Sequence, residues 1–419
     1  MNEKSETEHH VLKYCRICKG DNLIPYLDLG VTPLANGLIK SENIDKNELK
    51  FPLVVCYCKD CSLSQLNVVV NPEILFSNYF YMSSISNTFK THCNSIALDL
   101  VETLKLDQDD LVVDIASNDG CLLQEFKKMN VKTLGIEPAV NLADLANSNG
   151  IKTLNHFWDN KVAQKIAKDY GGAKVISAFN VFAHVDDVHG FIQNIKTALN
   201  DDGMFVIQVP YMIDFLEKHE FDTVYHEHLS YFLLKPLQQI LENNGLKIIK
   251  VKKYPIHGGT IEVRAVKNSY ETKNMNSNID DFIIIEKNLG FYNEKSYLNF
   301  AKEVQNIKKN LLELIYDLHK QGKKIAAFAA SAKGNTLLNY CKIDSTSIQY
   351  IVDETPTKQG LLTPGGHIPI VPMSYLENNP PDYLLILAWN FVEEIMGKTN
   401  QFKIRGGKYI VPVPKIQIM

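Results

Sequence analysis

Residues 111–120 read LVVDIASNDG, a short apolar run that ends in small and polar residues. The run LVVDIA (111–116) has the length of a buried strand, and CLLQEFKKM, directly after the loop, has the apolar spacing of a helix. A strand, a short polar loop and a helix form the first unit of a parallel α/β sheet. This stretch therefore predicts the fold of the middle of the chain.

The same alternation of apolar runs and helical patterns continues to about residue 210. Further strands are predicted at KTLGIE (132–137), AKVISAFN (173–180) and GMFVIQV (203–209), with a helix at VHGFIQNIKTAL between the last two. The second strand ends in Glu137, twenty-three residues after Asp114. An acidic residue in that position can accept hydrogen bonds from ribose hydroxyls, so this sheet is predicted to bind a nucleoside.

The loop after the first strand distinguishes between two such ligands. It contains one glycine, Gly120, and lacks the G-x-G-x-x-G pattern that packs a dinucleotide pyrophosphate. This favours S-adenosylmethionine over NAD. The alternative is a plain strand-to-helix turn that binds nothing.

The first 70 or so residues contain five of the eight cysteines. Cys15 and Cys18 form one Cys-x-x-Cys pair, and Cys58 and Cys61 form a second. Two such pairs can direct four thiolates at one tetrahedral zinc, and an all-cysteine site leaves no open position, so the zinc is expected to be structural. A hairpin or loop that includes YLDLGVTPLANGL must lie between the pairs. Cys56 falls outside the spacing, and buried free cysteines are the alternative for the whole group.

The stretch YHEHLSYF (225–232) brings together residue types that transfer protons. A metal site there is disfavoured, because adjacent side chains on a strand or helix point apart and the H-E-x-x-H spacing is absent. The alternative for YHEH is a solvated turn, and the alternative for His184, in FNVFAHVDD, is a structural histidine.

The remainder of the chain predicts a second α/β unit. A helix near PLQQILENNG, two strands around KIIKVKKY and TIEVRAV with a turn at HGG, a polar linker near 268–280 and a long helix at roughly 298–321 precede it. Its strands are KKIAAFAA, IQYIVDETP and DYLLILAW. The loop ASAKGN (330–335) ends the first of these and opens a helix, which is the usual place for a phosphate, although it is not a Walker A motif and a structural turn is the alternative.

Length, composition and charge exclude several classes. The chain has 419 residues, 45% of them hydrophobic and 22% charged, with a net charge of −4. Two or three domains are expected from the length, and the charge offers no broad attraction to nucleic acid or to acidic membranes. No apolar run reaches the roughly 18 residues needed to cross a bilayer, and the polar start MNEKSETEHH does not read as a signal peptide. A cytoplasmic protein is expected.

Motifs over nearly the whole chain resemble one family, the S-adenosylmethionine-dependent sugar C-methyltransferases of deoxysugar biosynthesis. The resemblance rests on CRIC, LDLGVTPLAN, CKDCSLSQL, VVDIASNDGCLL, GIEPA, FNVFAHVDD, YHEHLSYF, HGGTIEV, FAASAKGNTLLNY, DETPTKQGLLTPGGHIPI and LAWNFVEEI, in that order. Asp114 stands where many relatives have glutamate, and Ala116 where many have glycine. Both keep the size and polarity that the loop needs.

The resemblance implies three domains. They are a zinc-binding lobe over 1–75, a class I Rossmann-like methyltransferase core over 76–267 and a Rossmann-like C-terminal domain over 268–419 that holds the nucleotide of the substrate. The substrate is expected to be a nucleotide-linked 4-keto sugar, dTDP-linked or linked to another nucleoside diphosphate, methylated most often at C-3. The protein is expected to be a monomer or a small homo-oligomer.

The chemistry implied by the resemblance needs a carbon nucleophile. A base must remove a proton next to a carbonyl, and a donor must stabilise the enolate oxygen. By correspondence with the family, His228 is predicted to be the base, Glu227 an orienting or proton-handling partner, and Tyr225 a donor or a second base. His184 would polarise the keto oxygen, and Tyr79 is a further candidate with Tyr81 as the alternative. His226 has no predicted role.

The predicted binding residues fall into two sets. The first set would bind the cofactor: Asp114, Ala116, Ser117, Asn118, Asp119, Gly120, Glu137, Pro138, Phe157, Asn180 and Phe182. The second set would bind the substrate: Tyr81, His257, Ser331, Lys333, Gly334, Asn335 and Asp353. Two rival functions remain, an O- or N-methyltransferase acting on a sugar nucleotide and a non-catalytic zinc-containing protein that binds sugar nucleotides.

Overall fold

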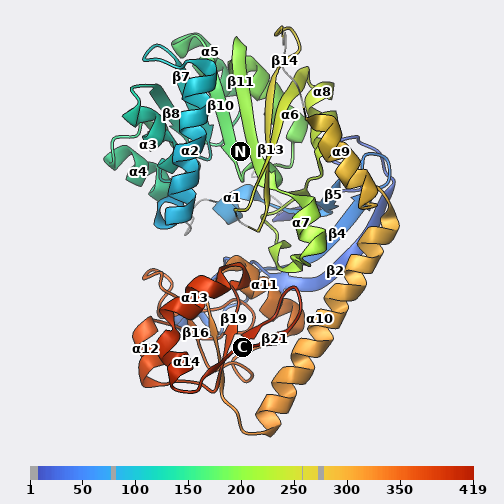
Figure 1. Ribbon diagram of the computed structural model, residues 1–419, viewed down its shortest axis with the longest axis vertical. Coiled ribbons are helices and arrows are strands. Elements are labelled where there is room, and N and C mark those ends of the chain that lie inside the picture. Colours follow the sequence, from blue (N-terminus) through green and yellow to red (C-terminus); the bar gives the residue numbers. More distant parts are fainter. Residues whose placement is uncertain (1–7, 77–81, 257, 272–277) are drawn as a thin grey trace, which may run out of the picture.

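The computed structural model describes residues 8–76, 82–256, 258–271 and 278–419. Three parts lie along the long axis of the molecule (Figure 1). The large sheet and its helices form one end, the C-terminal domain forms the other, and the N-terminal strands run beside both. Among the described helices, none combines the length and the apolar character needed to span a bilayer.

The N-terminal lobe is built from short strands and one long hairpin. Its strands are β1 (His9–Val11), β2 (Leu23–Pro33), β3 (Ile39–Lys40), β4 (Lys50–Cys58), β5 (Ser64–Leu66) and β6 (Val68–Val70). β2 and β4 pair antiparallel, which confirms the predicted hairpin between the cysteine pairs. The four-stranded sheet runs β12-β5-β4-β2, where β12 (Ser230–Tyr231) comes from the YHEHLSYF stretch. This lobe therefore takes an edge strand from the middle of the chain.

The middle of the chain forms a seven-stranded sheet. Its order is β13-β14-β11-β10-β7-β8-β9. β14 pairs antiparallel with both β13 and β11, and the strands from β11 to β9 pair parallel. The strands are β7 (Leu111–Ile115), β8 (Lys132–Ile136), β9 (Thr153–Leu154), β10 (Ala173–Phe179), β11 (Leu199–Pro210), β13 (Leu246–Tyr254) and β14 (Thr260–Lys267). All four strands predicted from 111 to 209 are present, so the parallel α/β prediction is confirmed.

Helices cover both faces of this sheet because successive strand residues point to opposite sides. Val112 belongs to a buried cluster that includes residues of α2 and α3, whereas its neighbour Val113 belongs to a separate cluster that includes residues of α5, α6 and α8. The helices of this part of the chain are α1 (Pro72–Phe76), α2 (Asn87–Leu104), α3 (Cys121–Lys128), α4 (Val140–Ser148), α5 (Asn160–Tyr170), α6 (Val188–Ala198), α7 (Met212–Glu217) and α8 (Leu234–Asn243), with the 3-10 turns η2 (Ser83–Ile85), η3 (Phe182–His184) and η4 (Phe221–Thr223). The turn η1 (Ser41–Asn43) lies between β3 and β4 in the N-terminal lobe.

The C-terminal domain is a second α/β unit with a six-stranded sheet. Its order is β18-β16-β15-β19-β20-β21, parallel except for β21. The strands are β15 (Ile325–Phe328), β16 (Ile351–Val352), β17 (Leu361–Leu362), β18 (Ile370–Val371), β19 (Tyr383–Ile386), β20 (Lys408–Val411) and β21 (Gln417–Ile418), where β17 pairs with β3 instead. The helices are α11 (Ala332–Cys341), α12 (Met373–Asn378), α13 (Val392–Lys398) and α14 (Asn400–Ile404), with η5 (Trp389–Phe391).

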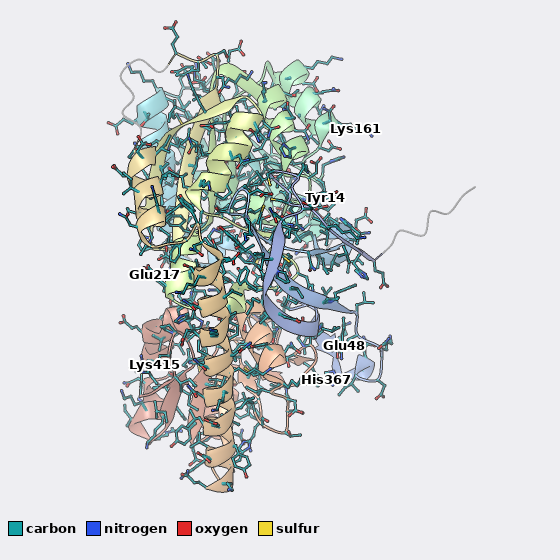
Figure 2. The ribbon with its side chains drawn as sticks, turned by 90° about the vertical axis from the view of Figure 1, so that its right-hand side faces the viewer. Tyr14, Glu48, Lys161, Glu217, His367 and Lys415 are labelled. Carbon is teal, nitrogen blue, oxygen red and sulfur yellow. The ribbon has the colours of Figure 1, made fainter. Side chains whose placement is uncertain are left out.

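One long helix ties the three parts together. After α9 (Ile279–Asn288), α10 (Glu294–Lys320) runs along the side of the molecule from the large sheet to the C-terminal domain (Figure 1). Its buried residues recur every three or four positions, from Tyr297 to Leu318, as expected for a helix with one apolar face. At the far side of the lobe, His367 donates from Nε2 to Glu48, 2.7 Å away (Figure 2). The predicted domain limits at 75/76 and 267/268 stay predictions.

Candidate active site and zinc site

The four predicted zinc ligands lie together at the end of the N-terminal hairpin. The Sγ atoms of Cys15, Cys18, Cys58 and Cys61 are all within 4.8 Å of one another, with Cys15–Cys61 at 3.4 Å and Cys18–Cys58 at 3.5 Å. Zinc–sulfur bonds of about 2.3 Å in a tetrahedron place sulfurs roughly 3.8 Å apart, so the donor set fits zinc. Cys56 is buried outside this group, and burial raises the pKa of its thiol to about 11.

The predicted cofactor loop is a strained turn between β7 and α3. Ala116, Asn118 and Gly120 have φ angles of 49°, 54° and 80°, in the left-handed region. A Cβ on Gly120 would also lie 3.0 Å from the Ile151 side chain, so both space and backbone angle favour glycine there. This turn opens the N-terminus of α3.

Glu137 holds the loop from the neighbouring strand. Its carboxylate accepts hydrogen bonds from the backbone N–H groups of Asn118 and Ala139, each at 2.8 Å. Burial raises the pKa of Glu137, although these two donors oppose the shift. Each carboxylate oxygen has a second lone pair, so Glu137 can still accept from a ribose hydroxyl.

Three polar atoms around this loop are buried without a hydrogen-bond partner in the part of the chain that the structure describes. They are Ser117 Oγ, Asp119 Oδ1 and Asn180 Oδ1. Buried polar atoms are normally paired, so this cluster fits a polar ligand such as S-adenosylmethionine. Asn180 follows β10 directly and has a positive φ of 57°.

The other predicted cofactor residues differ in burial and in the contacts that their side chains make. Asp114 is buried and accepts from Ser177 Oγ at 2.6 Å, and burial raises its pKa to about 7. Pro138 is half-buried beside Glu137, and Phe157 is 40% exposed, which leaves its ring available for stacking. Phe182 is fully buried and stacks on Phe232, so its side chain belongs to the core, and only its backbone could face a cofactor.

His228 has a fixed tautomer. Its Nδ1–H donates to the Thr223 carbonyl at 2.7 Å, because a carbonyl can only accept. Nε2 therefore carries the lone pair and accepts the Tyr225 hydroxyl proton at 2.9 Å. Burial lowers the pKa of His228 well below its usual value, and nearby His184 and Lys333 lower it further. The ring is neutral at pH 7 and its basic atom faces Tyr225.

His184 lies against this pair, with its ring centroid 4.9 Å from that of His228. Its Nδ1–H donates to the Glu227 carbonyl at 2.6 Å, and burial lowers its pKa to about 4. A neutral ring with its proton on Nδ1 has none on Nε2. The predicted role of His184 toward the keto oxygen stays a prediction, and in this protonation state it would need a proton on Nε2.

Glu227 and His226 face the N-terminal lobe. The Glu227 carboxylate accepts from Asn36 Nδ2 at 2.6 Å, and His226 Nε2 donates to the Phe51 carbonyl at 3.2 Å. The Thr223 carbonyl orients the His228 ring, and the predicted role of Glu227 as a partner of His228 stays a prediction. His226 anchors this stretch to β4, a role that sequence reasoning did not assign.

In the C-terminal domain, the predicted phosphate loop lies at the ends of the parallel strands. Ser331 caps α11, its hydroxyl accepting from Gly334 N at 3.1 Å. Asp353 accepts from Ala330 N at 2.9 Å and so supports the loop from β16. Asn335 donates to the Ala35 carbonyl of the N-terminal lobe at 2.7 Å. Tyr79, Tyr81 and His257 fall outside the described residues.

Lys333 is already engaged by residues that sequence reasoning missed. Its Nζ lies 3.6 Å from Glu220 Oε2 and 5.2 Å from the centre of the Trp389 ring. Trp389 in turn donates to Asp222 at 2.7 Å, and burial raises the pKa of Asp222 to about 6. The only signal in the sequence for these contacts is the motif LAWNFVEEI, which contains Trp389.

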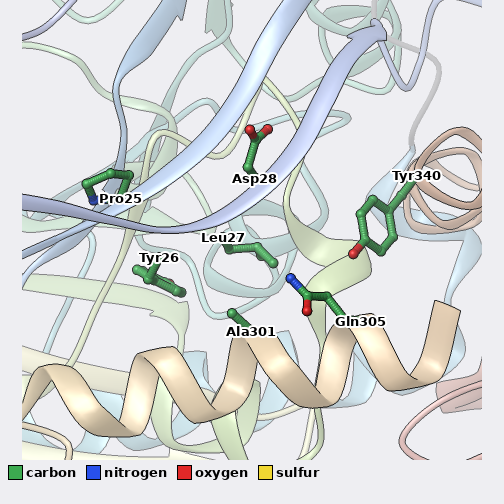
Figure 3. A pocket seen from close by; sticks show the side chains of 7 residues that line it. All are labelled: Pro25, Tyr26, Leu27, Asp28, Ala301, Gln305 and Tyr340. Atoms are coloured by element: carbon green, nitrogen blue, oxygen red, sulfur yellow. The ribbon is translucent and has the colours of Figure 1, made fainter. Parts of the chain in front are cut away.

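The described residues enclose cavities where the parts of the molecule meet. One of about 280 Å³ lies where α2, the β13–β14 turn and η5 meet, and its lining includes Lys218, Glu220 and Trp389. The other, of about 170 Å³, lies between β2, α10 and α11 (Figure 3). It contains no predicted site residue, whereas the larger one adjoins the Lys333 loop.

The middle sheet, its polar loop and Glu137 define the class, a class I S-adenosylmethionine-dependent methyltransferase. Comparisons with known proteins show which family of methyltransferases the chain belongs to. Family models match in chain order: "Putative zinc binding domain" over residues 15–76, "Methyltransferase domain" over 89–251 and "C-methyltransferase C-terminal domain" over 255–414. The C-methyltransferase NovU of Streptomyces niveus is 33% identical over 405 residues, 97% of this chain and 96% of NovU. The chain belongs to the C-methyltransferase family that includes NovU, and it is an S-adenosylmethionine-dependent C-methyltransferase with a zinc-binding lobe.

Solved structures give weaker likenesses to the middle of the chain. Magnesium protoporphyrin IX methyltransferase from Synechocystis PCC 6803, with bound S-adenosylmethionine, is 12% identical, covering 42% of this chain and 79% of that one at a TM-score of 0.33. A methyltransferase from Clostridium acetobutylicum ATCC 824 is also 12% identical, covering 43% and 92% at 0.35. The family assignment rests on NovU and the three family models.

Proposed function

We propose that this enzyme methylates a carbon, C-3, next to the keto group of a nucleotide-linked 4-keto deoxysugar, through an enolate that a histidine base generates. The observation that carries the proposal is the hydrogen-bond chain from the Thr223 carbonyl through His228 to the Tyr225 hydroxyl. C-methylation at such a carbon requires removal of a proton, and this chain supplies a neutral nitrogen base with a fixed orientation.

The cofactor pocket would lie at the ends of β7, β8 and β10. The unpartnered atoms of Ser117, Asp119 and Asn180 support this position, and Glu137 would accept from the ribose. S-adenosylmethionine, when bound, supplies the methyl group. The protein's contribution is to fix the approach of the two reacting carbons and to exclude water from them.

Proton removal would proceed through Tyr225 and His228 together. The Tyr225 hydroxyl already directs its proton at His228 Nε2, so it can pass that proton on while it receives one from the substrate carbon. His228 then becomes a cation that donates from both nitrogens. This positive charge stabilises the negative charge left on the enolate oxygen. Glu227 remains a candidate for later proton handling, and Tyr79 for contact with the sugar.

The nucleotide end would lie on the C-terminal domain. β15 begins its sheet, with β16 and β18 on one side and β19 and β20 on the other, so the strand order reverses between β15 and β19. Ligands of open α/β sheets bind at such a reversal, outside the carboxyl ends of the strands. The loop with Ser331, Lys333 and Gly334 lies there, which supports a diphosphate as its ligand.

One assay with two readouts tests the proposal. The enzyme is incubated with S-adenosylmethionine and a panel of 4-keto sugar nucleotides, and mass spectrometry detects the gain of one methyl group. In parallel, the same sugars are incubated in deuterium oxide without S-adenosylmethionine. We expect one sugar to gain a methyl group and to exchange the proton next to its ketone.

The outcomes separate the rival functions. Methylation without exchange, in the wild type and in a slowly methylating variant, indicates O- or N-methylation and contradicts the enolate. If calorimetry detects no binding of S-adenosylmethionine, the non-catalytic sugar-nucleotide-binding protein becomes the better description.

A further inference from the structure

Lys333 lies in the loop that is predicted to bind the diphosphate, yet its ammonium already forms an ion pair with Glu220. The ammonium lies 3.6 Å from Glu220 Oε2, over the face of Trp389, and in the described part of the chain it makes no hydrogen bond. An ion pair at this distance without a hydrogen bond is incomplete, because both charges have lost water and neither has gained a full partner.

Glu220 is the more constrained member of the pair. It is 4% exposed, and its Oε1 has no partner among the described residues. On one side it meets Gly258, where an added Cβ would lie 2.6 Å from Oε1. The carboxylate is therefore held in place by packing, and Lys333 is the flexible partner that can leave.

Space for a ligand lies directly beside this pair. Glu220 lines the cavity of about 280 Å³, together with Lys218 and Trp389. Pockets for whole small molecules are about 300–1,000 Å³, so this one has room for part of a sugar nucleotide. A ligand that enters it meets Glu220 and Trp389, the two side chains that lie against the Lys333 ammonium.

We propose that Glu220 is an internal competitor for the substrate's diphosphate, holding the Lys333 ammonium until the diphosphate takes it. The inference rests on the proposed function. A diphosphate forms charge-assisted hydrogen bonds with the ammonium and carries more negative charge than one carboxylate. Glu220 thereby reserves Lys333 for ligands with at least that charge, which makes it a specificity-determining residue.

The substitution Glu220→Gln tests this with a defined sign. Glutamine keeps the shape and the backbone contacts, including the hydrogen bond from Thr223 N to the Glu220 carbonyl at 3.0 Å. It removes only the charge that competes. Titration calorimetry with dTDP, UDP and GDP is expected to show about tenfold tighter binding of the preferred diphosphate, together with a lower KM for the matching sugar nucleotide. A variant that is merely damaged would bind more weakly.

Two controls make the result specific. Glu217→Gln removes an exposed carboxylate three residues away and is expected to leave the affinity unchanged. In a Lys333→Gln background, the further change Glu220→Gln should no longer tighten binding, because the competition needs the ammonium. This double-variant cycle is also the check if Glu220→Gln alone has a lower unfolding temperature.

Any other result of these binding measurements contradicts a specific part of the proposal. Weaker binding by Glu220→Gln would mean that Glu220 contacts the nucleotide itself, and unchanged binding would mean that it does not compete. If Glu220→Gln still tightens diphosphate binding in the Lys333→Gln background, the effect of Glu220 does not act through Lys333. If neither the wild type nor Glu220→Gln binds any of the three diphosphates, the nucleotide part of the proposed function is wrong, and this inference falls with it.

Discussion

A backbone carbonyl decides the chemistry that His228 can do. Since the Thr223 carbonyl accepts the proton on Nδ1, Nε2 is an acceptor, and the hydroxyl of Tyr225 donates to it. A carboxylate in the place of the Thr223 carbonyl would raise the pKa of the ring strongly. The neutral carbonyl raises it only weakly, so the lowering of the pKa by burial is the larger effect. The result is a neutral ring whose Nε2 carries no proton of its own at neutral pH and can act as a base.

Replacement of His228 tests its role directly. His228→Ala is expected to lower kcat by about 10²–10⁴-fold while the protein still folds and binds S-adenosylmethionine, because the ring contributes general base catalysis. Turnover is followed by mass spectrometry and cofactor binding by calorimetry. His319→Ala, at an exposed position on α10, is the matched control. A rate within a few-fold of the wild type would remove His228 from the mechanism.

The pH dependence follows from the same burial. His228 works when it is neutral, and its pKa is lowered well below 6.5, so activity should stay level as the pH falls through 6.5 and decline only at clearly lower pH. The profile of kcat/KM reports the free enzyme and is the measurement to use. A decline centred near pH 6.5 would mean that the base is a solvated histidine.

His226 predicts a pH effect on stability instead of on rate. Its folded pKa is about 4 because of burial, against 6.5 for an ordinary histidine. A lowered folded pKa gives stability that is present above pH 6.5 and is lost as the pH falls toward 4. His226→Gln should therefore lose about 2 kcal/mol less than the wild type between pH 8 and pH 5, as measured by urea unfolding. Equal losses would show that His226 is not buried in the neutral form.

At the scale of elements, the regular parts of both sheets followed from sequence pattern. β7, β8, β10 and β11 are continuous apolar runs because both of their faces are covered, and each was predicted within a few residues. β3, β12 and β17 were not predicted. Each has two residues, and its partner lies far away in the chain: β12 pairs with β5, and β17 with β3. A strand of that length has no periodicity of its own.

The zinc cluster gives a prediction at this scale. Cys15→Ser removes one ligand and is expected to reduce bound zinc from about one per chain to well below one, and to lower the yield of soluble protein, because metal binding contributes to folding of the lobe. Zinc is measured by plasma emission spectrometry. Cys56→Ser is the matched control, since Cys56 is buried on the same strand as Cys58 but outside the cluster. Loss of zinc in both variants alike would contradict the assignment of ligands.

At the scale of the molecule, the parts that sequence could not reveal are contacts between domains. The residue types in YHEH indicated proton transfer, but Asn36 and Phe51 hold two of its members from the N-terminal lobe. Likewise, the loop at Lys333 indicated a phosphate site, but its ion pair comes from Glu220, more than a hundred residues earlier. Backbone acceptors such as Thr223 O leave no signal in the sequence, because any residue would supply them.

These contacts predict that the zinc lobe affects catalysis more than cofactor binding. The lobe holds the YHEH stretch through β12–β5 pairing and the contacts of Asn36 and Phe51, whereas the loop at Ser117–Gly120 is supported by Glu137 inside the middle sheet. If a chelator strips the zinc, the lobe loosens and the base is misplaced first. We expect kcat to fall by at least about tenfold while the affinity for S-adenosylmethionine stays within about twofold.

Calorimetry and the methyl-gain assay are run on the same chelated sample, before and after zinc is restored. Recovery of the rate on addition of zinc shows that the loss was local and reversible. A rate that survives complete loss of zinc would show that the lobe does not position the base. A parallel loss of rate and cofactor affinity would show that the cofactor loop also depends on the zinc lobe.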